Sequence, residues 1–220
     1  LPALEERQPA AIRFFGAGVV GPHIERLQQL FQLTFGCHDV ICGSDLLGAS
    51  LALFGQESGI ACILGTGSNS CVMEGGQIVD QIPTLGFILG DEGSAGWIGR
   101  QLLRHHFYRS LPADLQGPFA AIAPDRIELL TLMRQDPYFN RHIAGSAAFV
   151  GQHAEHPFIV ELIRSSIREF LQFHVLPYGE DRVKALTLGF VGTVARCPTR
   201  TFRGRTPAHR RHTGSGFARP

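Results

Sequence analysis

The sequence lacks several features that mark common classes of protein. No apolar run approaches the roughly 18 residues that a membrane-spanning helix requires, and residues 1–6 have neither the basic nor the apolar region of a signal peptide. The five cysteines form an odd set without a Cys-x-x-Cys pair, which disfavours both a disulfide framework and a zinc site. We therefore expect a cytoplasmic protein without a membrane partner, whose cysteines are buried free thiols.

Apolar residues are plentiful in comparison with charged ones. They make up 44% of the 220 residues, whereas charged residues make up 18%, so we expect the chain to fold. This length allows one substantial core or two small lobes.

Lysine is almost absent, and the arginines are unevenly distributed. Lys184 is the single lysine, and seven arginines lie in residues 196–220, where no acidic residue occurs. The rest of the chain holds 13 basic and 19 acidic residues, which gives a net charge of −6 with histidine neutral. Because Pro, Thr and Gly interrupt these arginines without helical spacing, we interpret residues 196–220 as a non-native end from a shifted reading frame or as a disordered tail. A nucleic-acid-binding arm is the least favoured alternative, since no motif accompanies the charge.

Periodicity and glycine turns predict an alternation of strands and helices. The expected strands are residues 11–18, 39–44, 60–64, 70–74, 77–82 and 183–192. The expected helices are residues 23–35 and 45–55 and several within 94–178. This order predicts an α/β layer architecture with a largely buried sheet.

The helical part carries an apolar face and several histidines. The apolar face consists of Phe158, Leu162, Ile163, Phe170 and Phe173, and with Trp97 we expect it in the core. His153 and His156 have the i, i+3 spacing of a metal pair, but no third ligand lies nearby in the sequence. We read them as surface histidines and predict no metal site.

The segment Gly65-Thr66-Gly67-Ser68-Asn69 joins two expected strands. Its glycines permit positive φ and let backbone N–H groups approach an anion, so it could form a phosphate cradle. A plain hairpin turn has a similar composition and remains an alternative. The segment has neither the lysine of a P-loop nor the third glycine of a dinucleotide-binding fingerprint, which excludes both of those motifs.

Two acidic positions follow expected strands or glycine turns and precede helices. In residues 85–94, Asp91 and Glu92 lie between glycines, and Asp91 or Ser94 could cap the helix that follows. Asp45 lies at the junction of a strand and a helix, where a capping role is again an alternative to chemistry.

Five segments in a fixed order carry a resemblance that none of them carries alone. They are residues 16–18, 42–49, 59–70, 85–95 and 189–195, with Gly-Thr-Gly-Ser-Asn and Gly-Asp-Glu-Gly-Ser as the discriminating pair. In this order they resemble the N-acetylglucosamine kinase and BadF/BadG-type ATPase family over about residues 10 to 195.

The resemblance implies an α/β fold of the ribonuclease-H-like actin-type ATPase class, with two lobes and a cleft between them. Residues 1–56 would be the C-terminal part of the first lobe, 57–195 most of the second lobe, and 196–220 the basic tail. The implied reaction transfers the γ-phosphoryl group of ATP, with Mg²⁺, to an amino sugar, most simply to the 6-hydroxyl of N-acetylglucosamine. ATP and the sugar are the expected partners, with a homodimer as a further expectation.

The resemblance also implies a role for each residue in the matching motifs. Asp45 would be the catalytic base, and Gly65, Thr66 and Gly67 would bind the phosphates of ATP. The sugar would be bound by Ser68, Asn69, Gly86 and Asp91. These roles suit the residue types, because phosphoryl transfer needs mainly positioning and charge stabilisation, and carboxylates and amides bind sugar hydroxyls.

The sequence departs from the family at both ends. The family's first phosphate loop, an Asp-Gly-Gly-Gly stretch, does not occur here, and the residues after Ala195 do not match the adenine-side motif. We therefore expect this chain to be an inactive fragment of a kinase. The alternatives are an ATPase that activates an acyl-CoA dehydratase through an iron-sulfur cluster, and a sugar-binding domain without catalysis. The first alternative needs cluster cysteines before the glycine turn, but Ile63 stands two residues before Gly65, and Cys62 lies within an expected strand.

Overall fold

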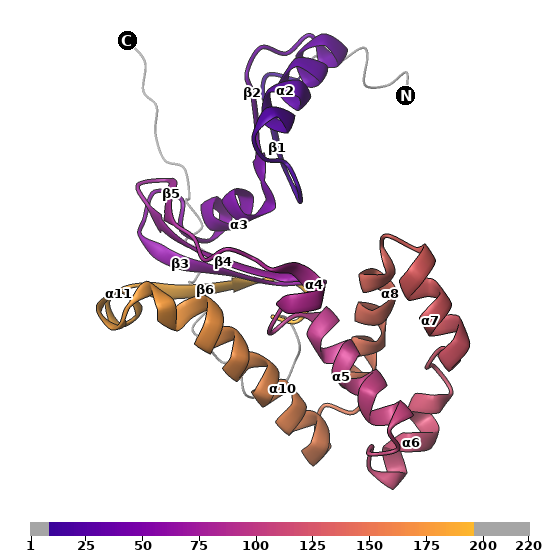
Figure 1. Cartoon of the computed structure of the whole chain (residues 1–220). Coiled ribbons are helices and arrows are strands. Elements are labelled where there is room, and N and C mark those ends of the chain that lie inside the picture. The colour runs from indigo at the N-terminus through magenta and orange to yellow at the C-terminus, as the bar shows by residue number, and fades with distance from the viewer. Residues whose placement is uncertain (1–8, 196–220) are drawn as a thin grey trace, which may run out of the picture.

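Two β-sheets and the helix between them organise the protein (Figure 1). The computed structural model describes residues 9–195. The first sheet is parallel and consists of β1 (Ile12–Gly16) and β2 (Val40–Ser44). The second has the order β5-β4-β3-β6, in the bounds β3 (Gly59–Leu64), β4 (Ser68–Glu74), β5 (Gln77–Asp80) and β6 (Thr187–Val191). The helix α3 (Asp45–Phe54) connects the two sheets.

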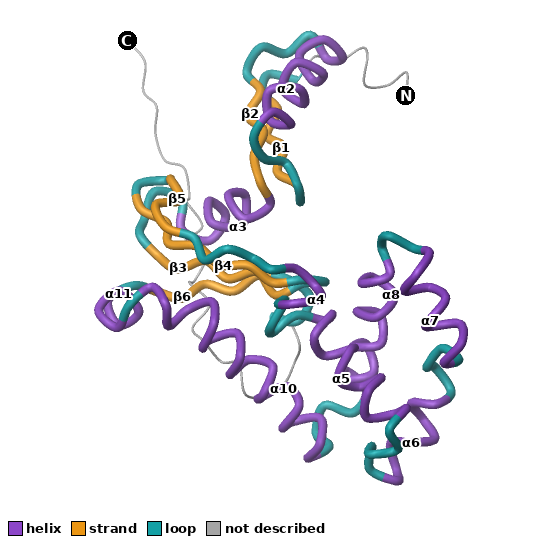
Figure 2. The backbone as a smooth tube through the Cα atoms, viewed as in Figure 1, coloured by secondary structure: helices purple, strands orange, loops and turns teal. Residues whose placement is uncertain are grey.

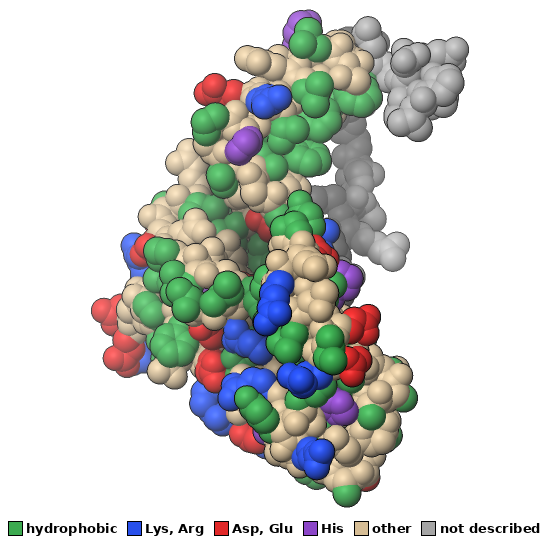
Figure 3. All heavy atoms as spheres, turned by 45° about the vertical axis from the view of Figure 1, so that its right-hand side comes forward, with side chains coloured by type: hydrophobic (Ala, Val, Ile, Leu, Met, Phe, Trp, Pro, Cys, Tyr) green, Lys and Arg blue, Asp and Glu red, His purple; other side chains and the backbone are tan. Residues whose placement is uncertain are grey.

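The first sheet is covered by α2 (Pro22–Phe35), as the helical spacing of residues 23–35 predicts. Pro22 begins the helix, and Gly36 ends it in the left-handed conformation, which glycine adopts without steric cost. Apolar residues of the sheet and the helix, among them Val40 and Phe31, form a small core. The exposed ring of Phe14 lies 5.3 Å from the ring of Phe31. Much apolar surface of this unit is nevertheless exposed, since Leu33 of α2 is 86% exposed, and Figure 3 shows hydrophobic side chains gathered on this part of the molecule.

The central strand β3 is buried on both faces. It pairs antiparallel with β4 and parallel with β6. Ile60, Cys62 and Leu64 belong to the core that faces the C-terminal helices, whereas Ala61 packs with α3 on the other face. This alternation follows from the two-residue period of a strand.

The helix α3 runs antiparallel to β3. Its end, Phe54, covers Gly59 at the start of β3, where a Cβ atom would lie 2.5 Å from the phenyl ring. Further along the helix, Ser50 Oγ lies 3.1 Å from Cys71 Sγ, and Cys71 pairs with Ala61. The start of α3 therefore lies toward the carboxyl end of β3.

The remaining helices are α4 (Gly86–Leu89), α5 (Ala95–Phe107), α6 (Ala113–Ala120), α7 (Arg126–Gln135), α8 (Phe139–Gly145), α9 (Phe149–Gln152), α10 (Pro157–Phe170) and α11 (Glu180–Ala185). α10 lies along the other face of the second sheet, whereas α5, α6, α7 and α8 gather beyond one end of the sheet and share a hydrophobic core with α10 (Figure 2). Two 3₁₀ turns occur at Ser146–Ala148 and Leu176–Tyr178, and a π-helical segment occurs at Leu171–Val175. No helix among residues 9–195 has both the length and the apolar character needed to cross a membrane.

Most expected elements are confirmed, and two expectations are wrong. The last strand starts at Thr187, because residues Val183–Ala185 belong to α11, which has two acidic residues in its first turn. Phe173 is 49% exposed, whereas Phe170 and Trp97 are buried. The π-helical segment shifts the helix register after Phe170, so that His174 and Val175 take the buried positions instead.

Four cysteines, Cys37, Cys42, Cys62 and Cys71, are free and buried, which confirms the expectation for them. Cys197 and the segment 196–220 lie outside the described residues. The lobe boundary at residue 56 stays a prediction.

The close approach of α5 and α8 gives a test of this packing. A Cβ on Gly99 would lie 2.0 Å from the carbonyl oxygen of Ile143, so Gly99→Ala should lower the free energy of unfolding by about 1–3 kcal/mol or more. Gly145→Ala is the control, because it lies at the end of the same α8 with nothing within 4 Å of its Cβ position. Urea unfolding should show the control to be at least as stable as the parent, because Gly145 has helical dihedral angles that alanine adopts without strain. Equal stability of the two variants would contradict this packing.

Candidate functional site

The turn between β3 and β4 is anchored on the first turn of α5. The carbonyl of Gly65 accepts a hydrogen bond from Ala95 N–H at 2.8 Å, and the carbonyl of Thr66 accepts one from Gly96 N–H at 3.0 Å. A helix leaves these N–H groups without an internal partner, so the turn satisfies them. The amides of Thr66 and Gly67 have no hydrogen-bond partner within residues 9–195. The turn thus offers backbone donors of the kind that bind phosphate oxygens.

Asp91 packs against this turn in an unusual backbone conformation. Its φ is +61°, in the left-handed region, which Asp tolerates better than most residues. Its Oδ1 accepts a hydrogen bond from Ser68 N–H at 3.2 Å, and the residue is 9% exposed. A Cβ on Gly67 would lie 2.8 Å from that oxygen, so this approach requires glycine at position 67. Burial raises the pKa of the Asp91 carboxyl, and the Ser68 N–H partly offsets this shift.

The segment that carries Asp91 leads into α5, and Ser94 caps that helix. The Ser94 hydroxyl accepts a hydrogen bond from Trp97 N–H at 3.1 Å. Of the two candidate caps, Ser94 therefore has this role, and the Asp91 carboxylate is directed to the glycine turn. Glu92 contacts a different element, since its Oε2 lies 3.0 Å from Nε2 of His174.

Asp45 is the exposed first residue of α3, and the capping role again falls to a neighbour. Ser44 is the N-cap, because its hydroxyl accepts the N–H of Leu47 at 3.2 Å. Among residues 9–195, the carboxylate of Asp45 accepts only the N–H of the next residue, Leu46, at 2.9 Å. It is therefore available to a ligand.

The packing of α3 places Asp45 near the level of Asn69. From Ser50 back to Asp45 the helix advances about 7.5 Å, and from Cys71 back to Asn69 the strand advances about 6.8 Å. Since Ser50 and Cys71 are in contact, both Asp45 and Asn69 lie at the end of the sheet where the glycine turn lies.

Ser68 and Asn69 begin β4 directly after the turn, so they are strand residues rather than turn residues. The Ser68 hydroxyl is buried and has no hydrogen-bond partner among the described residues. Asn69 Oδ1 accepts hydrogen bonds from Ser70 N–H at 2.9 Å and from Gln81 Nε2 at 3.2 Å. Gln81 thereby orients the amide so that its NH₂ group can donate to a ligand.

Gly86 is less closely connected to the other predicted site residues. It begins α4 with a φ of +67°, and a Cβ there would meet nothing within 4 Å. Its carbonyl accepts the N–H of Gly90 at 2.8 Å, one residue before Asp91. Of the sequence-predicted residues, the structure brings the glycine turn, Ser68 and Asp91 into direct contact and leaves Gly86 at the edge.

Sequence reasoning did not single out three residues that support the site. They are Gln81, which contacts Asn69, His174, which contacts Glu92, and Tyr178, whose hydroxyl lies 2.8 Å from Ser70 Oγ. Gln81 is exposed, and His174 and Tyr178 lie far along the sequence from the residues that they contact. No local pattern in the sequence therefore indicated these contacts.

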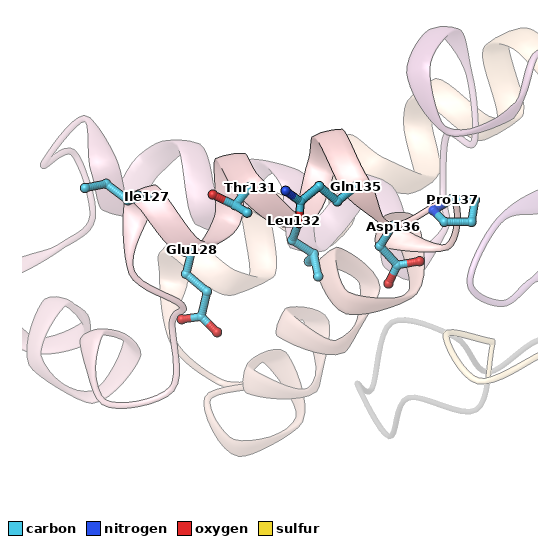
Figure 4. Close-up of a pocket in the computed structure, with 7 residues that line it drawn as sticks. All are labelled: Ile127, Glu128, Thr131, Leu132, Gln135, Asp136 and Pro137. Carbon is cyan, nitrogen blue, oxygen red and sulfur yellow. The ribbon is translucent and has the colours of Figure 1, made fainter.

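A surface hollow elsewhere on the molecule does not involve these residues. It has a volume of about 490 Å³ and is lined by α7 and the turn that follows it, as Figure 4 shows. Its lining residues are Ile127, Glu128, Thr131, Leu132, Gln135, Asp136 and Pro137. None of them belongs to the predicted site. Residues 9–195 also contain no group of three His, Cys, Asp or Glu side chains that could hold a metal ion.

Solved structures with the same arrangement are candidate sugar kinases. A candidate N-acetylglucosamine kinase from Porphyromonas gingivalis is 35% identical, with a TM-score of 0.79, and the match covers 84% of this chain and 65% of that one. The predicted kinship with the N-acetylglucosamine kinase family is confirmed. A candidate N-acetylglucosamine kinase from Chromobacterium violaceum has the same fold, at 20% identity, a TM-score of 0.63, and coverage of 84% of this chain and 66% of that one.

The kinship confirms the predicted fold class, an α/β fold of the ribonuclease-H-like actin type. The chain spans just under two thirds of the length of these two N-acetylglucosamine kinase relatives. No protein-family model matches the sequence, and no curated protein matches it.

The buried Asp91 predicts an unusual dependence of stability on pH. A carboxyl whose pKa is raised by folding stabilises the fold when protonated, and this contribution is lost as the pH rises through the folded pKa. Asp91→Asn keeps an acceptor for Ser68 N–H and tolerates the left-handed backbone, but it carries no charge. It should therefore unfold at a higher temperature than the parent at pH 7, with a difference that shrinks as the pH falls toward 4.

Thermal unfolding between pH 4 and 8, followed by circular dichroism, measures this effect. Glu57→Gln removes an exposed carboxylate and serves as the control, with the same melting temperature as the parent. A lower melting temperature for Asp91→Asn at pH 7 would show that the buried charge stabilises the fold.

Proposed function

We propose that this chain provides the sugar-binding and phosphate-binding part of an ATP-dependent amino-sugar kinase. The observation that carries the proposal is the contact between Asp91 and the glycine turn. It places a carboxylate that can bind sugar hydroxyls directly beside backbone amides that can bind phosphate. A kinase needs these two kinds of group side by side, because it must hold acceptor and donor in one site.

The proposed reaction transfers the γ-phosphoryl group of ATP to the 6-hydroxyl of N-acetylglucosamine. Asp45 accepts the hydroxyl proton as the sugar oxygen attacks the γ-phosphorus. The bond from the γ-phosphorus to the bridging oxygen breaks, and ADP leaves. Asp45 suits this role because its residue is exposed, and its carboxylate accepts a single hydrogen bond within the described part of the chain, from the N–H of Leu46.

The proposed sugar ligands are the side chains around the start of β4. Asp91 and Asn69 supply a charged acceptor and a neutral donor, and the Ser68 hydroxyl supplies a group that has no hydrogen-bond partner in residues 9–195. We assign Gly86 to the edge of this sugar site. The polar groups are thus arranged for a ligand with several hydroxyls.

The proposed phosphate-binding segment is Gly65, Thr66 and Gly67, with the backbone amides of Thr66 and Gly67 as the ligands. The amide of Gly65 donates to the carbonyl of Gly67 at 2.9 Å, so Gly65 would contribute by holding the shape of the turn. Mg²⁺ prefers phosphate and carboxylate oxygens, and in such kinases it is bound largely through the phosphates of the nucleotide. We therefore propose it as part of the ATP complex, where it would neutralise charge on the transferred group.

A homodimer stays a prediction. An iron-sulfur ATPase is disfavoured by the position of Cys62, which is 0% exposed in β3. Burial raises the pKa of its thiol, whereas a cluster ligand must be a thiolate.

The role of Asp45 can be tested in the full-length product of the gene, since the relatives are longer than this chain. Asp45→Asn keeps the size of the side chain but removes its basicity, so kcat should fall by roughly 10²–10⁴-fold. The KM for N-acetylglucosamine should change little. ADP release with N-acetylglucosamine and ATP measures both constants.

Asp91→Asn in the same assay is the comparison. Loss of a charged hydrogen bond should weaken sugar binding by about 1.5–3 kcal/mol and raise KM. A near-normal kcat in Asp45→Asn would remove Asp45 as the base. Sugar binding without any ADP release in the parent would instead favour a binding domain.

A further inference from the structure

A buried histidine lies behind the proposed sugar site, in the π-helical segment Leu171–Val175. His174 is 4% exposed, and its ring stacks on Phe170 with centroids 5.1 Å apart. Its Nε2 lies 3.0 Å from Oε2 of Glu92, whose side chain is 16% exposed. Glu92 directly follows Asp91, so this contact connects the π-helical segment to the residue beside the glycine turn.

A chain of hydrogen bonds holds the π-helical segment against β4. Ile82 N–H donates to the Tyr178 hydroxyl at 3.2 Å. The same hydroxyl lies 2.8 Å from Ser70 Oγ. The Ser70 hydroxyl donates to the carbonyl of His174 at 2.6 Å. All these bonds are satisfied if each hydroxyl donates to the next group, an arrangement that strengthens every member. The backbone of His174 is therefore fixed relative to the strand that begins with Ser68 and Asn69.

The turn that contains Asp91, Glu92 and Gly93, which His174 contacts through Glu92, has a strained backbone. A left-handed conformation costs a residue with a Cβ about 1–2 kcal/mol, so something must hold Asp91 at its φ of +61°. Gly93 lies between Leu64 and Phe170, where a Cβ would be 2.9 Å and 2.7 Å from their atoms. Backbone hydrogen bonds also hold the turn, since Ser94 N–H donates to the carbonyl of Asp91 at 3.2 Å. The Glu92 side chain is a further anchor, and His174 is its partner.

We infer that His174 is a positioning residue for the proposed sugar site. It holds the Glu92 carboxylate, and through it the left-handed Asp91 whose Oδ1 accepts the Ser68 N–H. The role as a sugar-site residue rests on the function proposed above. The effect on the position of Asp91 does not, because it can be observed without any ligand.

The surroundings of the ring assign its proton. Nδ1 is buried and has no hydrogen-bond partner among the described residues. Buried N–H groups without an acceptor are rarer in proteins than acceptors without a donor. The Nε2–H tautomer therefore fits best, with Nε2–H donating to Glu92.

The first test breaks the contact from the turn side. Glu92→Ala removes the partly exposed carboxylate and leaves no buried charge, so the fold should persist. We expect the Ser68 amide, followed by hydrogen exchange in NMR, to exchange at least about 10-fold faster, as loss of a charge-assisted hydrogen bond implies. The dissociation constant for N-acetylglucosamine, measured by calorimetry on the full-length protein, should rise by a similar factor.

The second test changes the histidine. His174→Gln keeps an N–H donor for Glu92 and should preserve both readouts, whereas His174→Leu should reproduce Glu92→Ala. The double variant Glu92→Ala/His174→Leu should be no worse than either single variant, because both remove the same contact. Ser166→Ala is the matched control. Ser166 lies on α10, and its buried hydroxyl has no hydrogen-bond partner among the residues that the structure describes, so its removal should leave both readouts at parent values.

Unchanged Ser68 exchange in folded Glu92→Ala overturns the inference, even if His174→Leu fails to fold. Additive effects in the double variant overturn it as well. If the parent binds no sugar while Ser68 exchange responds as expected, the proposed function fails and the positioning of Asp91 by His174 stands.

Discussion

The arrangement of the candidate site depends on one close approach, between the Asp91 carboxylate and the backbone at Gly67 and Ser68. It needs glycine in the turn between β3 and β4 and a left-handed aspartate in the connection between α4 and α5. Once the two segments meet, the carbonyls of the glycine turn lie against the start of α5, and Ser94 can cap that helix. A buried carboxylate opposes folding, so the surrounding contacts must compensate for it. A charged group kept in place at such a cost is typical of a functional site.

The second sheet fixes the distance between this contact and the start of α3. Phe54 fits over Gly59 and Gly189, two positions where a Cβ would collide with it or with its neighbour Leu53. The helix can therefore lie close to the strands along its length. The position of Asp45 is therefore set by the packing of Phe54 and Leu53 at the other end of α3, and not by a contact of its own carboxylate with the sheet.

The sequence predicted much of this because the relevant signals are local. Alternating apolar residues, glycine turns and helix ends gave the strands and helices of the first half, and Ser94 was one of two expected caps. The contact between Asp91 and Ser68 could not be predicted from spacing, since 23 residues separate them and only tertiary packing brings them together. The family resemblance placed both in one site, whereas periodicity alone left Asp91 and Asp45 as capping residues.

The same limits explain what was wrong or absent. The exposure of Phe173 contradicts its spacing, because spacing assumes an uninterrupted α-helix. His174 carried no signal in the sequence, since a single histidine in a helical segment is compatible with either a buried or an exposed position. Gln81 lies near the end of an expected strand, and nothing in the sequence around it indicates its contact with Asn69.

The π-helical segment at Leu171–Val175 corresponds to an α-helix that contains one extra residue. Such an insertion rotates every later residue about the helix axis, so it changes which side chains of Leu176–Tyr178 reach β4. Deleting one residue here would return the helix to α-helical register and turn Tyr178 away from Ser70 without altering any residue of the site. In a relative, the number of residues in this helix therefore indicates whether the contacts between the helix and Ser70 of β4 can form.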